Sequence, residues 1–195
     1  MRYICGRVNN PDKKRGIELI ENVILVDRLD TMTGTMEKME AHRVGLLHRA
    51  FSVFIFNTKG ELLLQQRAFN KYHSGGKWTN TCCSHPNPGE ETLAAAHRRL
   101  NEEMGMECEL HYAFNFIYRA VLEDGLSEHE FDHVFWGICD ATPMPEPTEV
   151  ASFKFMSMEE LATDIKLNPG RYTEWLKICF DLVMENYRKH ISGAS

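Results

Sequence analysis

A single amphipathic stretch between residues 90 and 104 constrains the fold of this chain more than any other feature. Apolar side chains recur in it at intervals of three and four, the spacing of one helical face, at Leu93, Ala96, Leu100 and Met104. Gly105 follows directly and suits a helix C-cap. Because the segments on both sides favour strands, the pattern predicts one helix inserted among strands rather than a helical bundle.

Short segments rich in β-branched and aromatic residues surround this helix. They predict strands at residues 23–27, 49–56, 61–67, 112–121, 128–138 and 153–156. Ser157 and Glu160 form a capping box that predicts a second helix. Residues 173–187 predict a third helix, with one side formed by Trp175, Cys179 and Leu182. Strands with helices interposed and appended predict an α+β or mixed α/β sandwich instead of repeated βαβ units.

Length, charge and cysteine content limit the class of protein. The 195 residues suit one domain, which we assign to residues 22–195 after a polar extension at residues 1–21. With 22 Lys and Arg against 28 Asp and Glu, the net charge is −6, so we expect no nucleic-acid partner. The first ten residues lack a long apolar segment, so we expect no signal peptide, and no run of about 20 apolar residues occurs, so we expect no membrane span. The 6 scattered cysteines predict a reduced, cytoplasmic protein, and we expect a monomer or a weak homo-oligomer.

Two pairs of opposite charges lie on the predicted helix, Arg98 with Glu102 and Arg99 with Glu103. At this i, i+4 spacing each pair stabilises a helix by about 0.3 kcal/mol. Adjacent carboxylates at a helix C-terminus also oppose the helix dipole, which favours a bound cation beside them. The spacing therefore allows either two surface ion pairs or a cation site.

A cysteine pair and a histidine precede this helix. In an extended segment Cys83 and His85 share one face, whereas Cys82 points to the other. A lone cysteine is more often a buried hydrophobic residue, and we assign that role to Cys82. Cys83 lies among polar residues, where a cation or a metal could stabilise its thiolate. It is therefore the candidate for chemistry.

Further ligand-type side chains lie in two other segments. Glu128 and Glu130 lie on the same face of a predicted strand, because side chains two residues apart share a face. His42 and His48 precede the strand at residues 49–56. Taken singly, such a histidine is more often structural. Together with His85 they form a set of three imidazoles and two carboxylates, which suits Zn²⁺, Mn²⁺ or Mg²⁺. Spacing alone does not show that the five side chains converge.

The helix and the loop before it resemble the Nudix box. The matching positions are Glu90, Arg98, Leu100, Glu102, Glu103, Gly105 and Met106. Two positions depart from the pattern: Ser84 replaces a glycine, and Arg99 replaces a metal-binding glutamate. The loss of a carboxylate and the gain of a cation weaken the expectation of a hydrolase and favour phosphate binding. The resemblance implies a Nudix-like α/β/α sandwich with a mixed central β-sheet.

Three further segments resemble type I isopentenyl diphosphate isomerases, a family with the Nudix fold. They are residues 45–52 (Gly-Leu-Leu-His-Arg-Ala-Phe-Ser), 79–86 (Thr-Asn-Thr-Cys-Cys-Ser-His-Pro) and 128–130 (Glu-His-Glu), and the likeness extends over residues 22–175. The resemblance implies a metal-dependent enzyme that interconverts isopentenyl diphosphate and dimethylallyl diphosphate. Its partner is therefore expected to be a small-molecule diphosphate substrate.

The resemblance also implies roles for particular residues. Cys83 and Glu130 match the catalytic pair and Tyr118 a residue that assists proton transfer; we expect Glu130 with Tyr118 to act as the acid and Cys83 as the base. The implied ligands of the first metal are His42, His48, His85, Glu128 and Glu130, and Glu103 matches a ligand of a second Mg²⁺ that bridges the diphosphate. The implied substrate-binding residues are Lys38, Arg67, Lys71, Arg99 and Trp175.

Two other functions compete with this interpretation. The first is a Nudix pyrophosphohydrolase of nucleoside diphosphate derivatives, against which Arg99 and the Cys83/His85 pair count. The second is a non-catalytic protein with a structural zinc site built from Cys82, Cys83 and His85. Adjacent cysteines rarely bind one ion, so this second alternative ranks last.

Overall fold

The computed structural model describes residues 21–122 and 125–191; the predicted extension at residues 1–21 lies outside this part except for Glu21. The first half contains β1 (Asn22–Val26), β2 (Met32–Glu37), α1 (Lys38–Val44), β3 (His48–Phe56), β4 (Leu62–Arg67), β5 (Trp78–Thr79) and β6 (Cys82–Ser84). The second half contains α2 (Thr92–Met104), β7 (His111–Val121), β8 (Ser127–Ile138), β9 (Val150–Met156), α3 (Met158–Leu167), a 3-10 turn (Pro169–Arg171) and α4 (Glu174–His190).

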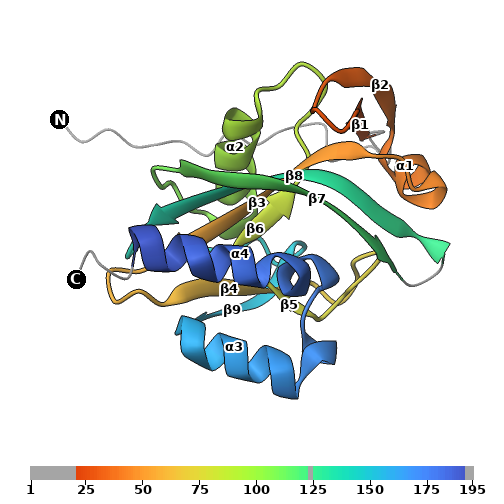
Figure 1. The fold of residues 1–195 in the computed structure, drawn as a ribbon. Coiled ribbons are helices and arrows are strands. Elements are labelled where there is room, and N and C mark those ends of the chain that lie inside the picture. The colour runs from red at the N-terminus through yellow and green to blue at the C-terminus, as the bar shows by residue number, and fades with distance from the viewer. Residues whose placement is uncertain (1–20, 123–124, 192–195) are drawn as a thin grey trace.

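Strand β3 is the centre of a mixed sheet (Figure 1). Along one edge it pairs in parallel with β8 over its whole length, from His48 opposite Glu130 to Phe56 opposite Ile138. Its other edge pairs in succession with β1, β6 and β4, all antiparallel. Strand β7 extends the sheet beyond β8, and β9 extends it beyond β4. The predicted mixed sheet is confirmed.

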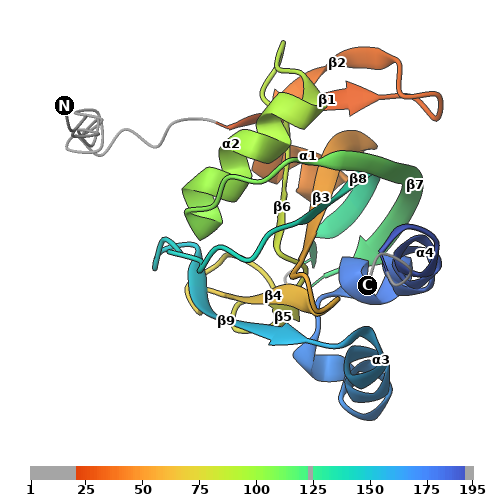
Figure 2. The ribbon, with the colours of Figure 1, turned by 90° about the vertical axis from the view of Figure 1, so that its left-hand side faces the viewer.

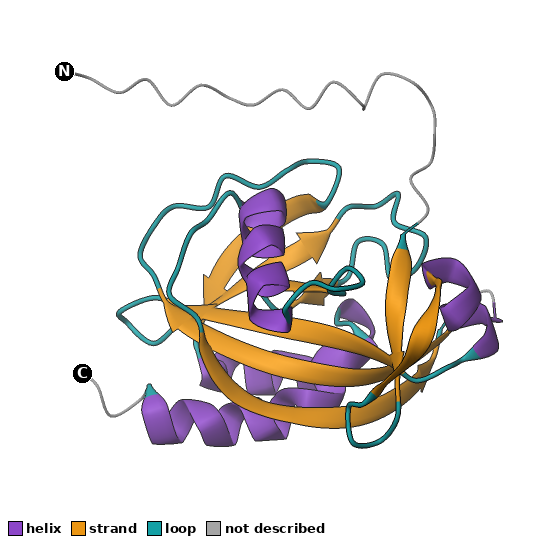
Figure 3. Cartoon of the chain, turned by 90° about the horizontal axis from the view of Figure 1, so that it is seen from above, coloured by secondary structure: helices purple, strands orange, loops and turns teal. Residues whose placement is uncertain are grey.

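The side chains on the two faces of β3 pack against different helices. Phe51, Val53 and Ile55 pack with α2 in one apolar cluster, whereas Phe54 and Phe56 pack with α3 and α4 in another. This is the period-two alternation of a strand that is covered on both sides. Figure 2 shows α2 on one side of the strands with α3 and α4 on the other, and Figure 3 shows the strands curving between them. The arrangement confirms the predicted sandwich.

The predicted helix ends at the expected residue. Gly105 caps α2 with a φ of 63°, and a Cβ there would lie 2.5 Å from the carbonyl oxygen of Met144, so both conformation and space require glycine. The capping box of Ser157 and Glu160 opens α3 as predicted. The prediction that Leu93 and Leu182 belong to buried apolar helix faces is wrong, because these side chains are 42% and 43% exposed.

Segments with little apolar periodicity form the elements that the sequence did not predict. Helix α1 is only 7 residues long, and β2, β5 and β6 are strands of 2 to 6 residues. Short elements carry too few periodic positions for a pattern to be recognised. None of the helices within the described residues is long and apolar enough to cross a membrane.

Candidate active site and metal centre

One cavity collects most of the predicted site residues. It encloses about 600 Å³ of empty space, which includes open solvent at its mouth. The predicted residues that line it are Lys38, Arg67, Lys71, Cys83, His85, Arg99, Glu103, Tyr118, Glu128, Glu130 and Trp175. His42 and His48 do not line the cavity, and their side chains have no solvent exposure. Residues from both halves of the chain therefore meet at one place.

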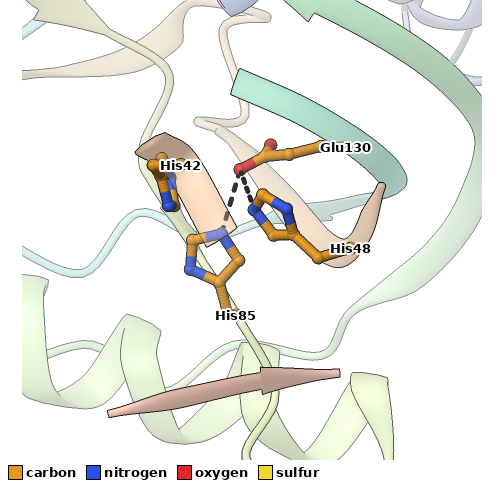
Figure 4. A group of neighbouring side chains, drawn as sticks. All are labelled: His42, His48, His85 and Glu130. Atoms are coloured by element: carbon orange, nitrogen blue, oxygen red, sulfur yellow. Dashed lines mark hydrogen bonds and ion pairs between the residues drawn. The ribbon is translucent and has the colours of Figure 1, made fainter. Parts of the chain in front are cut away.

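Four ligand-type side chains form a compact group next to the cavity (Figure 4). One ligand atom from each of His42, His48, His85 and Glu130 lies within 4.8 Å of all the others. The parallel register of β3 and β8 places His48 directly opposite Glu130. Oε1 of Glu130 lies 2.9 Å from Nε2 of His85 and 3.6 Å from Nε2 of His48. The fold thus brings together four of the five predicted ligands.

The orientation of two imidazoles suits metal binding. Nδ1 of His42 donates to the carbonyl oxygen of Lys38 at 2.7 Å, and Nδ1 of His48 donates to that of Leu46 at 2.8 Å. In the neutral rings these bonds leave the Nε2 lone pair unprotonated. Both Nε2 atoms are buried and lack a hydrogen-bond partner. A buried, unsatisfied nitrogen pair beside a carboxylate fits a divalent ion.

Glu128 belongs to a second group that shares His42. Its Oε2 lies 3.1 Å from Nε2 of His42, and its Oε1 lies 3.3 Å from Nε2 of His73. His42, His73 and Glu128 also meet the distance condition for holding a cation. His73 was not predicted, because it lies in a glycine-rich segment without periodicity. The available signal was an imidazole between the expected substrate residue Lys71 and the strand that begins at Trp78.

Burial and neighbouring charges shift the pKa values of Glu128 and Glu130 in opposite directions. Burial alone would raise the pKa of Glu130, but His48 and His85 outweigh it and hold the pKa well below its usual range. Burial and the adjacent charge of Glu130 raise the pKa of Glu128. Burial lowers the pKa of His85 and of His73 to about 3, so both are neutral near pH 7. Neutral imidazoles are the form that binds metals.

Tyr118 and Cys83 lie in the cavity wall beside Glu130. Tyr118 stands opposite Glu130 in the antiparallel pair of β7 and β8 and donates from its hydroxyl to Oε2 at 2.6 Å. Cys83 in β6 pairs with Ser52, whereas Cys82 is fully buried in the cluster around α2. The predicted division of the two cysteines between opposite faces is confirmed. Burial raises the pKa of the Cys83 thiol.

A third buried carboxylate on β8, which the sequence did not predict, follows Glu128 and Glu130. Asp132 is buried two residues beyond Glu130 and accepts a hydrogen bond of 2.8 Å from the Ser52 hydroxyl. Burial raises the pKa of Asp132 well above its usual range. The metal groups within residues 21–122 and 125–191 contain no cysteine, so nothing in this part of the chain supports a zinc site built on Cys82.

The predicted basic residues line one side of the cavity with acidic partners. One terminal nitrogen of Arg99 donates to Glu103 at 2.7 Å, and the same nitrogen lies 3.5 Å from a carboxylate oxygen of Glu149. Lys71 also pairs with Glu149, a residue that was not predicted. These contacts hold the guanidinium and ammonium groups in a half-buried cluster facing the cavity. Two cations and two carboxylates thus lie together on this side of the cavity.

Side-chain contacts hold other predicted residues in place. Arg98 binds Glu90 through two nitrogens at 2.7 and 2.8 Å, so this pair fixes the loop against α2. Arg67 lies 5.3 Å from the ring of Trp175, whose Nε1 donates to Asn80 at 3.2 Å. The first helical turn of α4 thereby places an aromatic face on the cavity.

Comparisons with known proteins identify the family of this chain. The chain matches the NUDIX domain family over residues 46–176. It is 53% identical to an isopentenyl-diphosphate Delta-isomerase of Pectobacterium atrosepticum, over 90% of this chain and 98% of that protein. It is 49% identical to isopentenyl-diphosphate Delta-isomerase 2 of Aromatoleum aromaticum, over 90% of this chain and 93% of that protein.

Solved structures support the fold. The DR0079 protein of Deinococcus radiodurans superposes with a TM-score of 0.71 at 22% identity, covering 86% of this chain and all of that one. The MutT protein of Methanosarcina mazei Go1 gives 0.59 at 20% identity, covering 73% of this chain and 94% of that one. The chain belongs to the NUDIX domain family and, within it, to the isopentenyl-diphosphate Delta-isomerases.

Proposed function

We propose that this protein isomerises isopentenyl diphosphate to dimethylallyl diphosphate through a tertiary carbocation, with Cys83 and Glu130 as the acid–base pair. The observation that carries the proposal is the single cavity in which Cys83, Tyr118 and Glu130 lie beside a His/Glu metal group and a cluster of basic side chains. A phosphate ester needs the basic cluster, and an alkene needs a positioned acid and base.

The reaction moves one proton to the substrate and removes another. A proton adds to C4 of the terminal alkene, the positive charge develops at C3, and a proton leaves C2 to form the new double bond. We assign the addition at C4 to Glu130 with Tyr118. The lowered pKa of Glu130 leaves its carboxylate ionised, and burial raises the pKa of Tyr118, so the proton that is delivered resides on the phenol, which a 2.6 Å hydrogen bond joins to Oε2 of Glu130. We assign the removal at C2 to Cys83.

Cys83 must lose its own proton before it can act as a base. Burial raises the pKa of this thiol, and among the neighbouring charges Arg67 opposes that rise. A divalent ion bound by His42, His48, His85, Glu128 and Glu130 would add positive charge that favours the thiolate. We propose Mn²⁺, Zn²⁺ or Mg²⁺ for this site, since its donors are nitrogen and oxygen.

The diphosphate group of the substrate and the carbocation that develops at C3 need separate binding partners. We propose that Lys38, Arg67, Lys71 and Arg99 bind the diphosphate, and that Glu103 would help to hold a second Mg²⁺, which would offset the negative charge of the phosphates. The indole of Trp175 offers the carbocation an aromatic face that contains no nucleophile able to trap it. The contact of Arg67 with the same ring, at 5.3 Å, supports a diphosphate partner next to the partner of the hydrocarbon.

The proposed site is complete within one chain. Every side chain to which we give a role comes from residues 38–175 of the same molecule. We propose that the protein acts as a monomer. The free thiols of Cys82, Cys83, Cys108, Cys139 and Cys179 suit a reducing compartment, and we place the protein in the cytoplasm on that ground.

A single assay distinguishes isomerase from hydrolase. The protein is incubated with isopentenyl diphosphate and Mg²⁺ plus Mn²⁺, while proton and phosphorus NMR spectra are recorded together. Isomerisation replaces the terminal alkene protons by dimethylallyl signals and leaves the diphosphate resonances in place. Release of inorganic phosphate or pyrophosphate at the same rate would instead identify a hydrolase and refute the proposal.

A further inference from the structure

His73 is a buried histidine in the cavity wall that the proposed mechanism does not use. It lies in the segment at residues 68–77 between β4 and β5 and is 5% exposed. Its Nε2 lies 3.3 Å from Oε1 of Glu128, and its Nδ1 is buried without a hydrogen-bond partner. The ion-pair partner of the buried His73 Nε2 is therefore a carboxylate proposed as a metal ligand.

The carboxylate of Glu128 lies between two imidazoles. Oε1 faces His73, and Oε2 faces Nε2 of His42 at 3.1 Å. The Oε2 atom is itself buried without a hydrogen-bond partner. If one oxygen is held, the rigid plane of the carboxylate fixes the direction of the other. In this orientation Oε2 is presented to the nitrogen that also belongs to the group of His48, His85 and Glu130.

We propose that His73 is a positioning residue for the metal centre. Its Nε2–H donates to Oε1 of Glu128 and thereby holds Oε2 as the fifth ligand. This inference rests on the proposed function, because it requires a metal in the site. Hydrogen bonds to ligating groups commonly tune metal affinity by about 10- to 100-fold, so the contact is sufficient for a measurable effect.

His73 acts through Glu128 rather than as a ligand of the four-residue group. Its Nε2 carries the proton that it donates to Oε1 of Glu128 and so has no lone pair to offer an ion. His42 cannot serve two ions, since Nδ1 donates to Lys38 and only Nε2 retains a lone pair. The group of His42, His73 and Glu128 is therefore not a second, simultaneous metal site.

Aromatic contacts fix the ring of His73 in this position. Tyr72 packs at right angles to it with a centroid distance of 4.5 Å, and Trp175 packs in the same manner at 5.9 Å. A ring held on two sides keeps its N–H direction, which is the requirement for positioning a carboxylate. The contact with Trp175 also connects the metal centre to the aromatic wall proposed for the carbocation.

The test compares variants that remove or restore the donor. His73→Phe keeps a planar ring but has no N–H, whereas His73→Gln places an amide nitrogen near the position of Nε2. His133→Phe is the matched control, because Nε2 of His133 lies 3.0 Å from Asp30 and neither residue belongs to the two groups of ligand-type side chains. Mn²⁺ affinity is measured by EPR titration of the apoprotein, and Co²⁺ binding by visible absorption.

We expect Mn²⁺ to bind about 10- to 100-fold more weakly to His73→Phe, with a changed Co²⁺ absorption spectrum. His73→Gln should recover most of the affinity, and His133→Phe should match the wild type. Unchanged affinity and Co²⁺ absorption in His73→Phe would overturn the proposal, as would equal weakening in the Phe and Gln variants.

Two further comparisons keep the outcome interpretable. If His73→Phe does not fold by circular dichroism, His73→Gln and His73→Asn carry the test, because the shorter amide does not reach the Nε2 position. Equal Mn²⁺ affinity in these two variants would overturn the proposal. A wild-type protein that binds no Mn²⁺ would refute the metal centre itself. A wild type that binds while His42→Ala does not, with His73→Phe unaffected, would refute the role of His73 alone.

Discussion

Tyr118 and Glu130 stand opposite each other on β7 and β8, and the phenol donates a 2.6 Å hydrogen bond to Oε2 of the carboxylate. The other oxygen of Glu130 lies 2.9 Å from His85. One carboxylate therefore connects a proton donor in the cavity with the histidines of the metal group. Sheet register produces the part of this connection that joins His48, Glu130 and Tyr118, since they are direct neighbours across three adjacent strands.

Replacement of Tyr118 by Phe should lower kcat by about 10²- to 10⁴-fold, the range typical of one lost proton-transfer group. The ring remains to fill its buried position, so the thermal unfolding temperature should change little. Steady-state kinetics and circular dichroism measure the two effects. A kcat within twofold of the wild type would show that the phenol takes no part in proton transfer.

Replacement of Cys83 by Ala should abolish turnover while metal content and folding stay nearly unchanged, because the lost thiol lies in the cavity wall rather than in the core. Cys82→Ala is the matched control on the next residue. It should retain substantial activity but lose about 1 kcal/mol of stability, since Cys82 is packed against α2. Loss of activity in Cys82→Ala, with an active Cys83→Ala, would reverse the assignment.

Arg99→Glu should raise the KM for isopentenyl diphosphate by on the order of tenfold and give at most trace pyrophosphate hydrolysis. The change removes a phosphate partner and places a carboxylate beside Glu102, Glu103 and Glu149. Arg99→Gln separates the loss of the cation from this added repulsion. A KM identical to that of the wild type in both variants would exclude a phosphate role for Arg99.

Loss of any one imidazole from His42, His48 or His85 should lower metal affinity by about 10- to 100-fold and reduce activity with it. His97→Ala, His111→Ala and His190→Ala are the controls, because these histidines lie outside the two metal groups. Metal stoichiometry after exhaustive dialysis is measured by mass spectrometry. Full metal retention in His42→Ala and His48→Ala would contradict the proposed ligand set.

The sequence predicted the elements with clear periodicity and missed those without it. Helix α2, the strands from β3 to β4 and the pair β7 and β8 all carry regular apolar patterns. The division of Cys82 and Cys83 between two faces followed from alternation in a strand. In contrast, α1 and the segment around His73 have no such pattern, and their positions depend on tertiary contacts.

The same reasoning explains which site residues were found. His42, Glu128 and Arg99 stand in recognisable motifs, whereas His73, Asp132 and Glu149 acquire partners only when distant segments fold together. Glu149 pairs with Lys71 across 78 residues of chain, and Ser52 bonds Asp132 across 80. No spacing rule applies at such separations. The structure was therefore needed to identify these contacts.

The most direct test of the central claim is turnover of isopentenyl diphosphate by the metal-loaded protein in deuterium oxide. Protonation at C4 predicts dimethylallyl diphosphate with solvent deuterium in a methyl group, detected by deuterium NMR and mass spectrometry, while the phosphorus spectrum still shows an intact diphosphate. Cys83→Ala should yield no such product. Release of inorganic phosphate or pyrophosphate without deuterium in the hydrocarbon would contradict the account.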